Sequence, residues 1–484
     1  MGVLSDLEPK RVFHYFEEIC GIPHGSYNEK VISDYLVAYA KEHGFEYVQD
    51  KLYNVLMWIP ASEGYEKEEP IILQGHMDMV CEKKPGVVLD MEKESIELVV
   101  DGDYVRAKDT TLGGDDGIAI AYMLAVAEDK TIAHPPLEYI ITVSEEVGMD
   151  GAAGIDLSKL KGNRMLNIDS EEEGIFLTSC AGGVSAHVTI PVLWELANGK
   201  QWYELVVSGL LGGHSGAEIH KERANSNKVL GRILSDIHGT ESLVLSAMEG
   251  GAKDNAIPLY SRAVIGLDAK DVDIVRKQIE KISVVLKAEY AVSDSEIAVC
   301  MKEMESKELV TKVLSKESLN HVITFLVTAP DGVQNMSVSV PGLVETSLNM
   351  GIMKLTDEHL FTQHAIRSSV TTKKHNVANQ MKWLAEAFGG TVECKGEYPA
   401  WEYKNESEVR NRIVALYEKM YGKQPKMEGI HAGLECGLLA GKIANLDCVS
   451  MGPNIFDIHT PAERLSISST KRVYEFLLAF LAQK

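Results

Sequence analysis

The chain has 484 residues, and its 71 Asp and Glu outnumber its 48 Lys and Arg, so the formal net charge is −23. This excess of negative charge argues against binding to nucleic acid or to an anionic membrane, because both need clustered basic side chains. Apolar residues make up 45% of the chain, enough for a large buried core. The length exceeds that of one ordinary domain, so we expect two or more lobes.

Neither a membrane span nor a disulfide framework is indicated. The longest unbroken apolar run, 118–127, is too short for a spanning helix, which needs about 20 residues. The first residues lack the basic stretch and apolar core of a signal peptide. The seven cysteines are scattered and form no CxxC pair, which also argues against a thiolate zinc site. We therefore expect a cytoplasmic enzyme.

The first part of the chain alternates helical patterns with short apolar runs. Two capping-box patterns, Ser5 with Glu8 and Ser26 with Glu29, each precede an apolar helical face. Short apolar runs bounded by glycine and charged residues are typical of buried parallel strands, and together with the helices they predict an α/β sheet with helices on its faces. The expected elements are strands at 45–48, 55–59, 71–73, 139–143 and 165–168, and a buried helix at 118–127.

The pattern changes after Gly182 and Gly183. The segments 184–190 and 203–207 alternate apolar and polar residues, which is typical of half-exposed antiparallel strands. Helices are expected at 226–238, 272–286, 408–421 and 466–482, and a last strand at 448–451. We therefore predict a discontinuous catalytic domain, 1–183 and 400–484, with a mostly parallel sheet. An α+β domain, 184–399, is inserted into it.

Histidine and acidic residues gather in five short segments. Four of the five directly follow a predicted strand. In an open α/β sheet, ligands bind beyond the carboxyl ends of the strands, so one cleft can collect all five. The segments are 75–78 (Gly-His-Met-Asp), 113–117 (Gly-Gly-Asp-Asp-Gly), 144–148 (Ser-Glu-Glu-Val-Gly), 167–170 (Asn-Ile-Asp-Ser) and 457–461 (Asp-Ile-His-Thr-Pro).

These residue types suit hydrolysis at two metal ions. Imidazole and carboxylate without thiolate favour zinc, with cobalt or manganese as substitutes, and a pair of ions needs a bridging carboxylate. In an extended segment His76 and Asp78 point the same way, so Asp78 can accept the second ring N–H of His76. Glu145 and Glu146 stand at the end of a predicted buried strand. Burying two adjacent carboxylates is costly unless a cation neutralises them. One can bind metal while the other deprotonates a metal-bound water.

Each segment also has a purely structural interpretation. The residues 75–78 could form a surface turn, 113–117 a turn that caps the next helix, and 144–148 a solvated loop. Asp169 could cap a helix, and His459 could be a buried structural histidine. All five together favour the metal site.

The order of these residues resembles the co-catalytic zinc peptidases related to glutamate carboxypeptidase and carnosinase. In detail it resembles the bacterial aminoacyl-histidine dipeptidases, also called Xaa-His dipeptidases, over nearly the whole chain. The phrases that carry the resemblance are LQGHMDMV (73–80), TLGGD (111–115), GLLGGHSG (209–216) and HAGLECG (431–437).

The resemblance implies two Zn²⁺ ions per chain. Asp115 would bridge them, His76 and Asp169 would complete one position, and Glu146 and His459 would complete the other. It further implies a cis peptide bond after the bridging Asp115.

The resemblance also assigns the proton transfers. Glu145 would act as general base toward a metal-bridging hydroxide and then protonate the leaving amine, while Asp78 would orient His76. One residue departs from the family pattern: relatives commonly carry Asn after the bridging Asp, and this chain has Asp116.

The inserted domain would be a lid and dimerisation domain. In relatives a lid histidine from the partner subunit helps to polarise the scissile carbonyl, and His214 matches it. Asn255 and Arg367 resemble residues that hold the substrate carboxylate, and Gly433 and Glu435 lie where relatives shape the substrate end of the catalytic domain. A loop position for His214 and a surface salt bridge for Arg367 are the alternatives.

The sequence thus predicts a cytoplasmic, homodimeric metallo-dipeptidase for Xaa-His substrates such as carnosine, with no nucleic-acid or membrane partner. A tripeptidase, an aminoacylase or another amidohydrolase on the same scaffold is the alternative. A catalytically inactive binding protein is disfavoured, because it would not need Glu145 in addition to the ligands.

Overall fold

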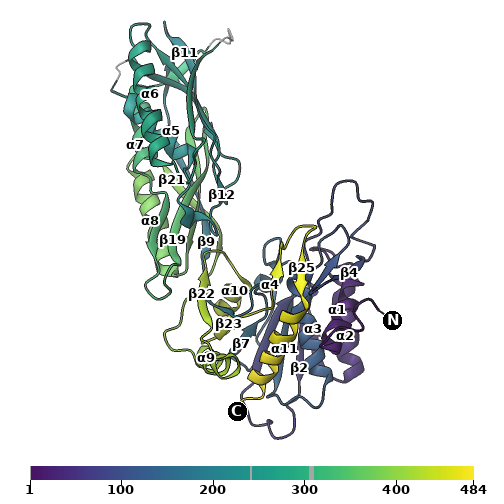
Figure 1. Ribbon diagram of the computed structural model, residues 1–484. Helices are drawn as coiled ribbons and strands as arrows, with labels where there is room; N and C mark the ends of the chain where they lie inside the picture. Colours follow the sequence, from purple (N-terminus) through teal and green to yellow (C-terminus); the bar gives the residue numbers. More distant parts are fainter. Residues whose placement is uncertain (1, 240–241, 305–309) are drawn as a thin grey trace. The chain divides into compact units, whose positions relative to one another are not determined.

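The computed structural model describes residues 2–239, 242–304 and 310–484. Its contacts divide the chain into two compact units (Figure 1). Unit 1 comprises residues 1–179, 403–429 and 434–484, and unit 2 comprises 180–402 and 430–433. The sequence placed the divisions at 183/184 and 399/400, and it did not anticipate the short second segment of unit 2.

Unit 1 is built on an eight-stranded sheet with the order β1-β2-β6-β3-β7-β23-β8-β22. Its central strands β6, β3, β7 and β23 are parallel, whereas β1–β2, β2–β6 and β23–β8 pair antiparallel. The carboxyl ends of the four central strands therefore lie along one edge. The bounds are β1 Glu46–Gln49, β2 Val55–Ile59, β3 Ile71–His76, β6 Leu137–Thr142, β7 Arg164–Asn167, β8 Ile175–Cys180, β22 Lys426–Ile430 and β23 Asp447–Ser450.

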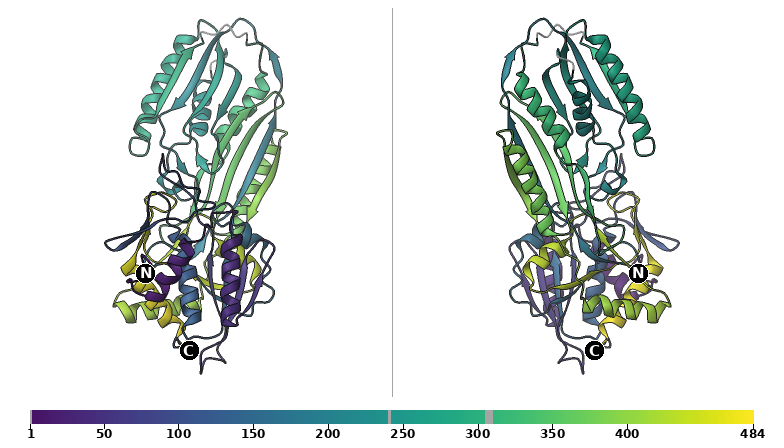
Figure 2. Two further views of the ribbon diagram at one scale, coloured as in Figure 1. Left: turned by 90° about the vertical axis from the view of Figure 1, so that its right-hand side faces the viewer. Right: turned by 90° about the vertical axis from the view of Figure 1, so that its left-hand side faces the viewer.

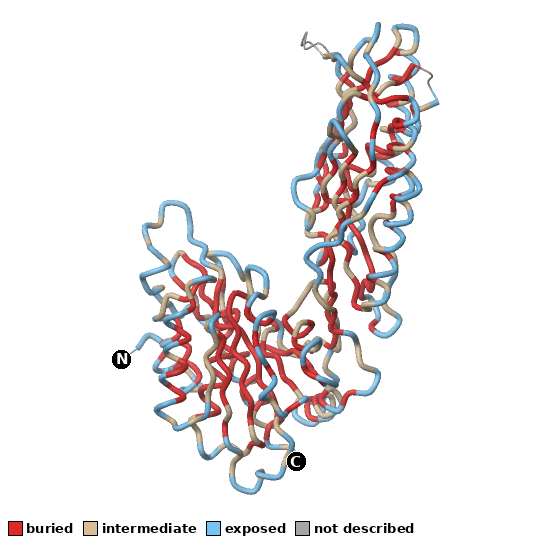
Figure 3. The backbone as a smooth tube through the Cα atoms, turned by 180° about the vertical axis from the view of Figure 1, so that it is seen from behind, coloured by how far each residue is buried: buried red, intermediate tan, exposed pale blue. Residues whose placement is uncertain are grey.

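The parallel centre follows from the apolar runs. Every residue of β3 and β6 is buried, as expected for strands covered on both faces, and Figure 3 shows this buried centre of unit 1. Helix α3 (Gly114–Glu128) is buried from Gly114 to Ala127 and contacts α1 (Lys10–Cys20) and β3. The other helices are α2 Lys30–His43, α4 Asp150–Gly154, α9 Glu408–Tyr421, α10 Glu435–Lys442 and α11 Ile467–Leu481.

A second, four-stranded sheet in unit 1 was not predicted. Its order is β24-β25-β5-β4, and its strands are too short to give a clear alternation in the sequence. The turn between β24 and β25 carries His459, so this small sheet positions one predicted ligand. The bounds are β4 Leu98–Asp101, β5 Tyr104–Ala107, β24 Ile455–Phe456 and β25 Arg464–Ser466.

Both capping-box predictions are wrong. The N-cap residues are Pro9 for α1 and Glu29 for α2, and neither side chain makes a capping hydrogen bond. The Ser26 hydroxyl instead donates to Asp78 Oδ2 at 2.8 Å. Glu29 Oε1 accepts the backbone N–H and the hydroxyl of Ser144 at 2.9 and 2.7 Å. These polar residues therefore hold the loops after β3 and β6.

Unit 2 contains a nine-stranded sheet with the order β16-β11-β15-β13-β19-β20-β9-β21, and β18 pairs with β19. The helices lie along one face of this sheet (Figures 1 and 2), which explains the alternating burial of β9 and β20. The helices are α5 Ser226–Ile237, α6 Val272–Glu289, α7 Lys316–Thr328 and α8 Thr371–Glu386. The strands are β9 Gly182–Pro191, β11 Gln201–Ser208, β13 Val244–Gly250, β15 Ser261–Leu267, β16 Ala298–Glu303, β18 Gly332–Met336, β19 Val344–Leu355, β20 His359–Ser368 and β21 Thr391–Tyr398.

Unit 2 also contains two short antiparallel strand pairs. Strand β10 (Trp194–Leu196) pairs with β17 (Lys312–Leu314), and β12 (Gly213–His214) pairs with β14 (Ala256–Ile257). The antiparallel strands predicted at 184–190 and 203–207 are confirmed as β9 and β11. Within the residues described, no helix has both the length and the apolar character needed to cross a membrane.

Candidate metal centre

The five predicted metal ligands come together in unit 1, at the carboxyl ends of the parallel strands. His76 is the last residue of β3, Glu146 follows β6, and Asp169 follows β7. Asp115 lies at the start of α3, and His459 lies between β24 and β25. The strand-end rule therefore explains three of the five positions directly.

Asp115 lies between the two histidines. Its Oδ1 is 3.2 Å from His76 Nε2, and its Oδ2 is 3.2 Å from His459 Nε2. Each carboxylate oxygen thus faces a different imidazole. This is the arrangement that a carboxylate bridging two ions requires.

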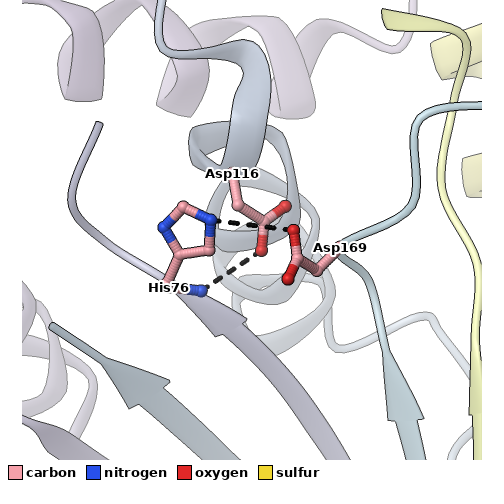
Figure 4. Close-up of side chains that lie close together, drawn as sticks. All are labelled: His76, Asp116 and Asp169. Atoms are coloured by element: carbon pink, nitrogen blue, oxygen red, sulfur yellow. Dashed lines mark hydrogen bonds and ion pairs between the residues drawn. The ribbon is translucent and has the colours of Figure 1, made fainter. Parts of the chain in front are cut away.

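One further carboxylate accompanies each histidine. Asp169 Oδ1 lies 3.6 Å from His76 Nε2, and Glu146 Oε1 lies 3.0 Å from His459 Nε2. Single ligand atoms of His76, Asp115 and Glu146 all lie within 4.8 Å of one another, and so do those of His76, Asp116 and Asp169. Figure 4 shows the second group.

The side chains present fit a pair of divalent cations. Glu146 Oε1 is buried, and apart from its ion pair with His459 Nε2 at 3.0 Å it has no hydrogen-bond partner among the described residues. Buried carboxylates without compensation are unstable, and a cation supplies that compensation. Imidazole nitrogens and carboxylate oxygens are ligands that Zn²⁺ accepts.

The field at this site is strongly negative. Hydrogen bonds to Asp115 and Glu146 raise the pKa of His459 to about 10. Burial opposes protonation of His76, but hydrogen bonds to Asp115 and Asp169 hold its pKa well above the usual value. The field that retains protons on these imidazoles also attracts metal cations, which displace protons when they bind.

Glu145, the predicted proton carrier, lies next to Glu146 in a partly buried, acidic environment. Burial raises its pKa well above the usual value, and the charges of Asp169, Glu435 and Glu146 act in the same direction against the opposing effect of His76. A raised pKa favours proton uptake by this carboxyl group, as a general base requires.

Asp78 contacts more of the site than the sequence predicted. His76 Nδ1 lies 3.0 Å from the Asp78 backbone carbonyl and 3.4 Å from its Oδ1, so the carbonyl is the closer acceptor. The carboxylate accepts the backbone N–H groups of Glu145 at 3.0 Å and Glu146 at 3.4 Å, and the Ser26 hydroxyl. Burial alone would raise the pKa of Asp78, but His76 and these donors lower it. Asp78 therefore fixes both the imidazole and the glutamate pair.

Asp116 is part of the buried site and not of the solvated surface. The Asp115–Asp116 peptide bond is cis, as the resemblance implied. Asp116 is 1% exposed, and its Oδ2 accepts the His76 backbone N–H at 3.2 Å (Figure 4). Burial and the nearby Asp169 charge raise its pKa well above the usual value. A carboxyl that keeps its proton offers one donor and one acceptor face, as the amide of Asn does.

The prediction that Glu435 contacts the substrate is not supported by its position. The side chain is fully buried at the start of α10, and its Oε2 accepts Gln74 Nε2 and Thr142 Oγ1, both at 2.6 Å. Gln74 in turn accepts Asn167 Nδ2 at 2.6 Å. Glu435 thus ties together the ends of β3, β6 and β7, beneath the ligands, and burial raises its pKa to about 7.

The remaining predicted residues belong to unit 2. The His214 backbone N–H donates to Glu218 Oε2 at 3.0 Å, and His214 Nδ1 accepts the Ala217 N–H at 2.9 Å. A neutral imidazole that accepts at Nδ1 carries its proton on Nε2. Burial, with Arg367 nearby, lowers the pKa of His214, so this neutral form is favoured.

Arg367 lies on β20, close to His214. A Cβ added to Gly216 would lie 3.0 Å from both Arg367 Nε and His214 Cε1. Arg367 Nη1 donates to the Tyr398 hydroxyl at 2.8 Å, and its buried Nε has no hydrogen-bond partner in the part of the chain described. An unsatisfied guanidinium N–H suits an incoming carboxylate.

Asn255 and Gly433 also belong to unit 2. The Asn255 carbonyl accepts the Ser215 N–H at 2.9 Å, next to His214, while its side chain is exposed. Gly433 is partly buried in the segment 430–433. Their predicted contacts with substrate stay predictions.

Sequence reasoning missed several residues of the site. Ser26 and Glu29 were interpreted as helix caps. Glu463 was overlooked although it lies two residues after the segment 457–461, and its carboxylate accepts the backbone N–H groups just before Asp115. Its place four residues after His459 was its only sequence signal.

The family comparison agrees with this geometry. The model of peptidase family M20/M25/M40 matches residues 72–483, and the chain belongs to this family. Fold, site and family together define a peptide-bond hydrolase. The resemblance, the fold class and the enzyme class predicted from the sequence are confirmed.

Particular relatives cover the full chain. It is 36% identical to the cytosol non-specific dipeptidase of Escherichia coli (strain K12) over 484 residues, 100% of this chain and 99% of that protein. The crystal structure of aminoacylhistidine dipeptidase from Vibrio alginolyticus matches with a TM-score of 0.92 and 35% identity, covering 99% of this chain and 97% of that one. Aminopeptidase PepT from Bacillus cereus shares the fold, with a TM-score of 0.57 at 16% identity over 98% of each chain.

Proposed function

We propose that this chain is a dipeptidase that works with two Zn²⁺ ions and prefers Xaa-His dipeptides. The observation that carries the proposal is Asp115, whose two oxygens face two histidines, each accompanied by a further carboxylate. The relatives that are 36% and 35% identical to this chain are both named as dipeptidases, which supports the proposal. Their names differ in the substrate range they state: one is called non-specific, and the other is named for aminoacylhistidines. Substrate preference is therefore the part that most needs testing.

Five side chains would hold the ions. His76 and Asp169 would hold one, Glu146 and His459 the other, and Asp115 would contact both. Bound divalent ions supply Lewis-acid polarisation of the scissile carbonyl and lower the pKa of water. Co²⁺ and Mn²⁺ are the expected substitutes, because they accept the same nitrogen and oxygen ligands.

Glu145 would move the proton. Its carboxylate would take a proton from the attacking water and later deliver it to the leaving amine. Asp78 supports this role, because its carboxylate accepts the Glu145 backbone N–H and so fixes the start of that loop.

Unit 2 would supply the residues that select the substrate. We propose that His214 donates its Nε2–H to the scissile carbonyl, and that Arg367 and Asn255 bind the substrate carboxylate. The accepting Nδ1 of His214 and the unsatisfied Nε of Arg367 support these two roles. Gly433, which has no side chain, would leave room for substrate beside them.

We further propose a cytoplasmic homodimer that associates through unit 2 and binds neither nucleic acid nor membranes. The name of the Escherichia coli relative supports the location, and the net charge of −23 supports the absence of anionic partners. Sedimentation or light scattering of the pure protein tests the dimer.

A substrate panel tests the function. Purified protein would be assayed with Xaa-His dipeptides, Xaa-Gly dipeptides, tripeptides and N-acyl amino acids, before and after removal of metal by a chelator. We expect hydrolysis of dipeptides with the highest kcat/KM for Xaa-His, loss after chelation, and recovery with Zn²⁺. Equal rates for Xaa-Gly would remove the histidine preference. Exclusive cleavage of tripeptides or N-acyl amino acids would replace the dipeptidase proposal, and full activity after chelation would contradict the metal centre.

A further inference from the structure

Glu463 is a buried carboxylate whose two oxygens are both used by backbone donors. It is 3% exposed. Its Oε2 accepts the N–H groups of Leu112 at 2.7 Å and Gly113 at 3.2 Å, and its Oε1 accepts the N–H of Gly114 at 2.8 Å. Three successive amides of one loop therefore converge on a single side chain that is distant in sequence.

The backbone of that loop is shaped for an anion. Gly113 has φ +72°, in the left-handed region, and an added Cβ there would lie 2.8 Å from Met79 Sδ. Successive N–H groups around a left-handed residue form a concave anion-binding nest. The nest also opens α3, whose N-terminus carries partial positive charge. In this protein Glu463 fills the nest from within the chain.

The nest joins two segments that each carry a metal ligand. Gly114 directly precedes Asp115, and Glu463 lies four residues after His459. Asp115 and His459 are 344 positions apart in sequence, yet Asp115 Oδ2 lies 3.2 Å from His459 Nε2. Among the described residues, two kinds of side-chain hydrogen bond connect these segments. One is the contact between the predicted ligands Asp115 and His459, and the other is formed by Glu463.

We propose that Glu463 is a positioning residue for the metal centre. By clamping the amides before Asp115, it sets the distance between Asp115 and His459, and so forms the position that Glu146 and His459 would share. This inference rests on the proposed two-metal site. An amide at 463 would turn an N–H toward one of the three amides, so the clamp needs a carboxylate.

Glu138 offers a matched control. It is 2% exposed, and its carboxylate accepts the N–H groups of Lys161 and Gly162, both at 2.9 Å, and Trp58 Nε1 at 3.2 Å. It therefore also satisfies three donors. It lies near the start of β6, at the opposite end of the strand from the ligands, so Glu138→Gln reports the cost of losing a buried carboxylate alone.

The experiment compares wild type, Glu463→Gln and Glu138→Gln as full chains. Bound Zn²⁺ per chain is measured against a metal buffer, the Co²⁺-substituted proteins are compared by visible absorption, and melting temperatures are recorded. Both variants are expected to melt earlier. Only Glu463→Gln is expected to weaken one of the two metal positions, by about 10- to 100-fold, and to change the Co²⁺ spectrum.

Two results would overturn the inference. One is wild-type affinity for both ions and an unchanged Co²⁺ spectrum in Glu463→Gln. The other is an equal loss of metal in Glu138→Gln. If Glu463→Gln does not fold, Glu463→Asp, which keeps the charge but shortens the reach, must show the same selective loss of one ion, and wild-type binding there also refutes the role. Failure of the proposed function is distinct, because wild-type protein would then bind no pair of ions.

Discussion

Replacing Glu145 by Gln tests the proposed chemistry most directly. The amide has nearly the same shape but cannot take up a proton, and the Glu145 backbone N–H can still donate to Asp78. General acid–base catalysis contributes about 10²- to 10⁴-fold. Glu145 would serve twice, as base and then as acid, so we expect a loss near the upper end. A 10⁴-fold loss of kcat corresponds to about 5.5 kcal/mol in the activation barrier.

The structure separates this loss from a loss of metal. The ligand contacts of Asp115 run to His76 and His459, and Glu145 is not among them. Glu145→Gln should therefore retain about two Zn²⁺ per chain. It should also fold at least as well as wild type, because it removes a partly buried carboxyl with a raised pKa from a negative cluster.

The assay is steady-state hydrolysis of an Xaa-His dipeptide together with metal analysis of the same sample. Glu146→Gln is the paired variant, because it removes an expected ligand and should lose one ion as well as activity. Near-normal kcat in Glu145→Gln would refute the proton-transfer role. Loss of metal in that variant would show that Glu145 is itself a ligand.

Two further predictions concern unit 2. His214→Ala should lose activity without losing metal, since His214 would act on the substrate carbonyl; steady-state kinetics with metal analysis checks this, and unchanged kcat would remove His214 from the mechanism. Burial lowers the pKa of His364 to about 3. Between about pH 6.5 and 3 this histidine is therefore protonated in the unfolded chain but neutral in the folded chain. The free energy of unfolding consequently falls as the pH drops from about 6.5 toward 3. At pH 5.5 the free energy of unfolding is lowered by about 1.4 kcal/mol through this histidine. Urea unfolding at pH 5.5 and 7.5 should therefore show a loss of stability on acidification that is smaller by this amount in His364→Asn than in wild type. An equal loss in both proteins would refute the prediction.

The sequence predicts which candidate ligands come together where a polar residue follows a strong apolar run. His76 ends the fully buried strand β3, and Asp169 comes two residues after β7, which is buried from Met165 to Asn167. Both the apolar run and the polar residue are local signals. Parallel strands place such residues at one edge by geometry alone. Asp115 and His459 lie in two of the five segments that the residue pattern selected, but their individual roles as ligands came from the resemblance, because no long apolar strand precedes them.

The sequence fails where a residue's partner is distant. Ser26 and Glu29 have the spacing of a capping box, and that spacing cannot reveal that Asp78 and Ser144 are their partners. Glu435 was assigned to the substrate for the same reason: nothing local shows that Gln74 and Thr142 bury its carboxylate.

The roles of the clustered carboxylates depend on their environments, which explains why residue type alone could not assign them. Asp78 accepts several N–H and O–H donors, and these lower its pKa despite burial. Asp116 is buried and Glu145 is partly buried among other carboxylates with fewer donors, and their pKa values are raised. One acidic cluster therefore contains three carboxyl groups whose pKa values are shifted in different directions, that of Asp78 downward and those of Asp116 and Glu145 upward. The net charge of −23 counts all three alike. Only the donors around each oxygen distinguish them, and those donors come from segments that the fold brings together.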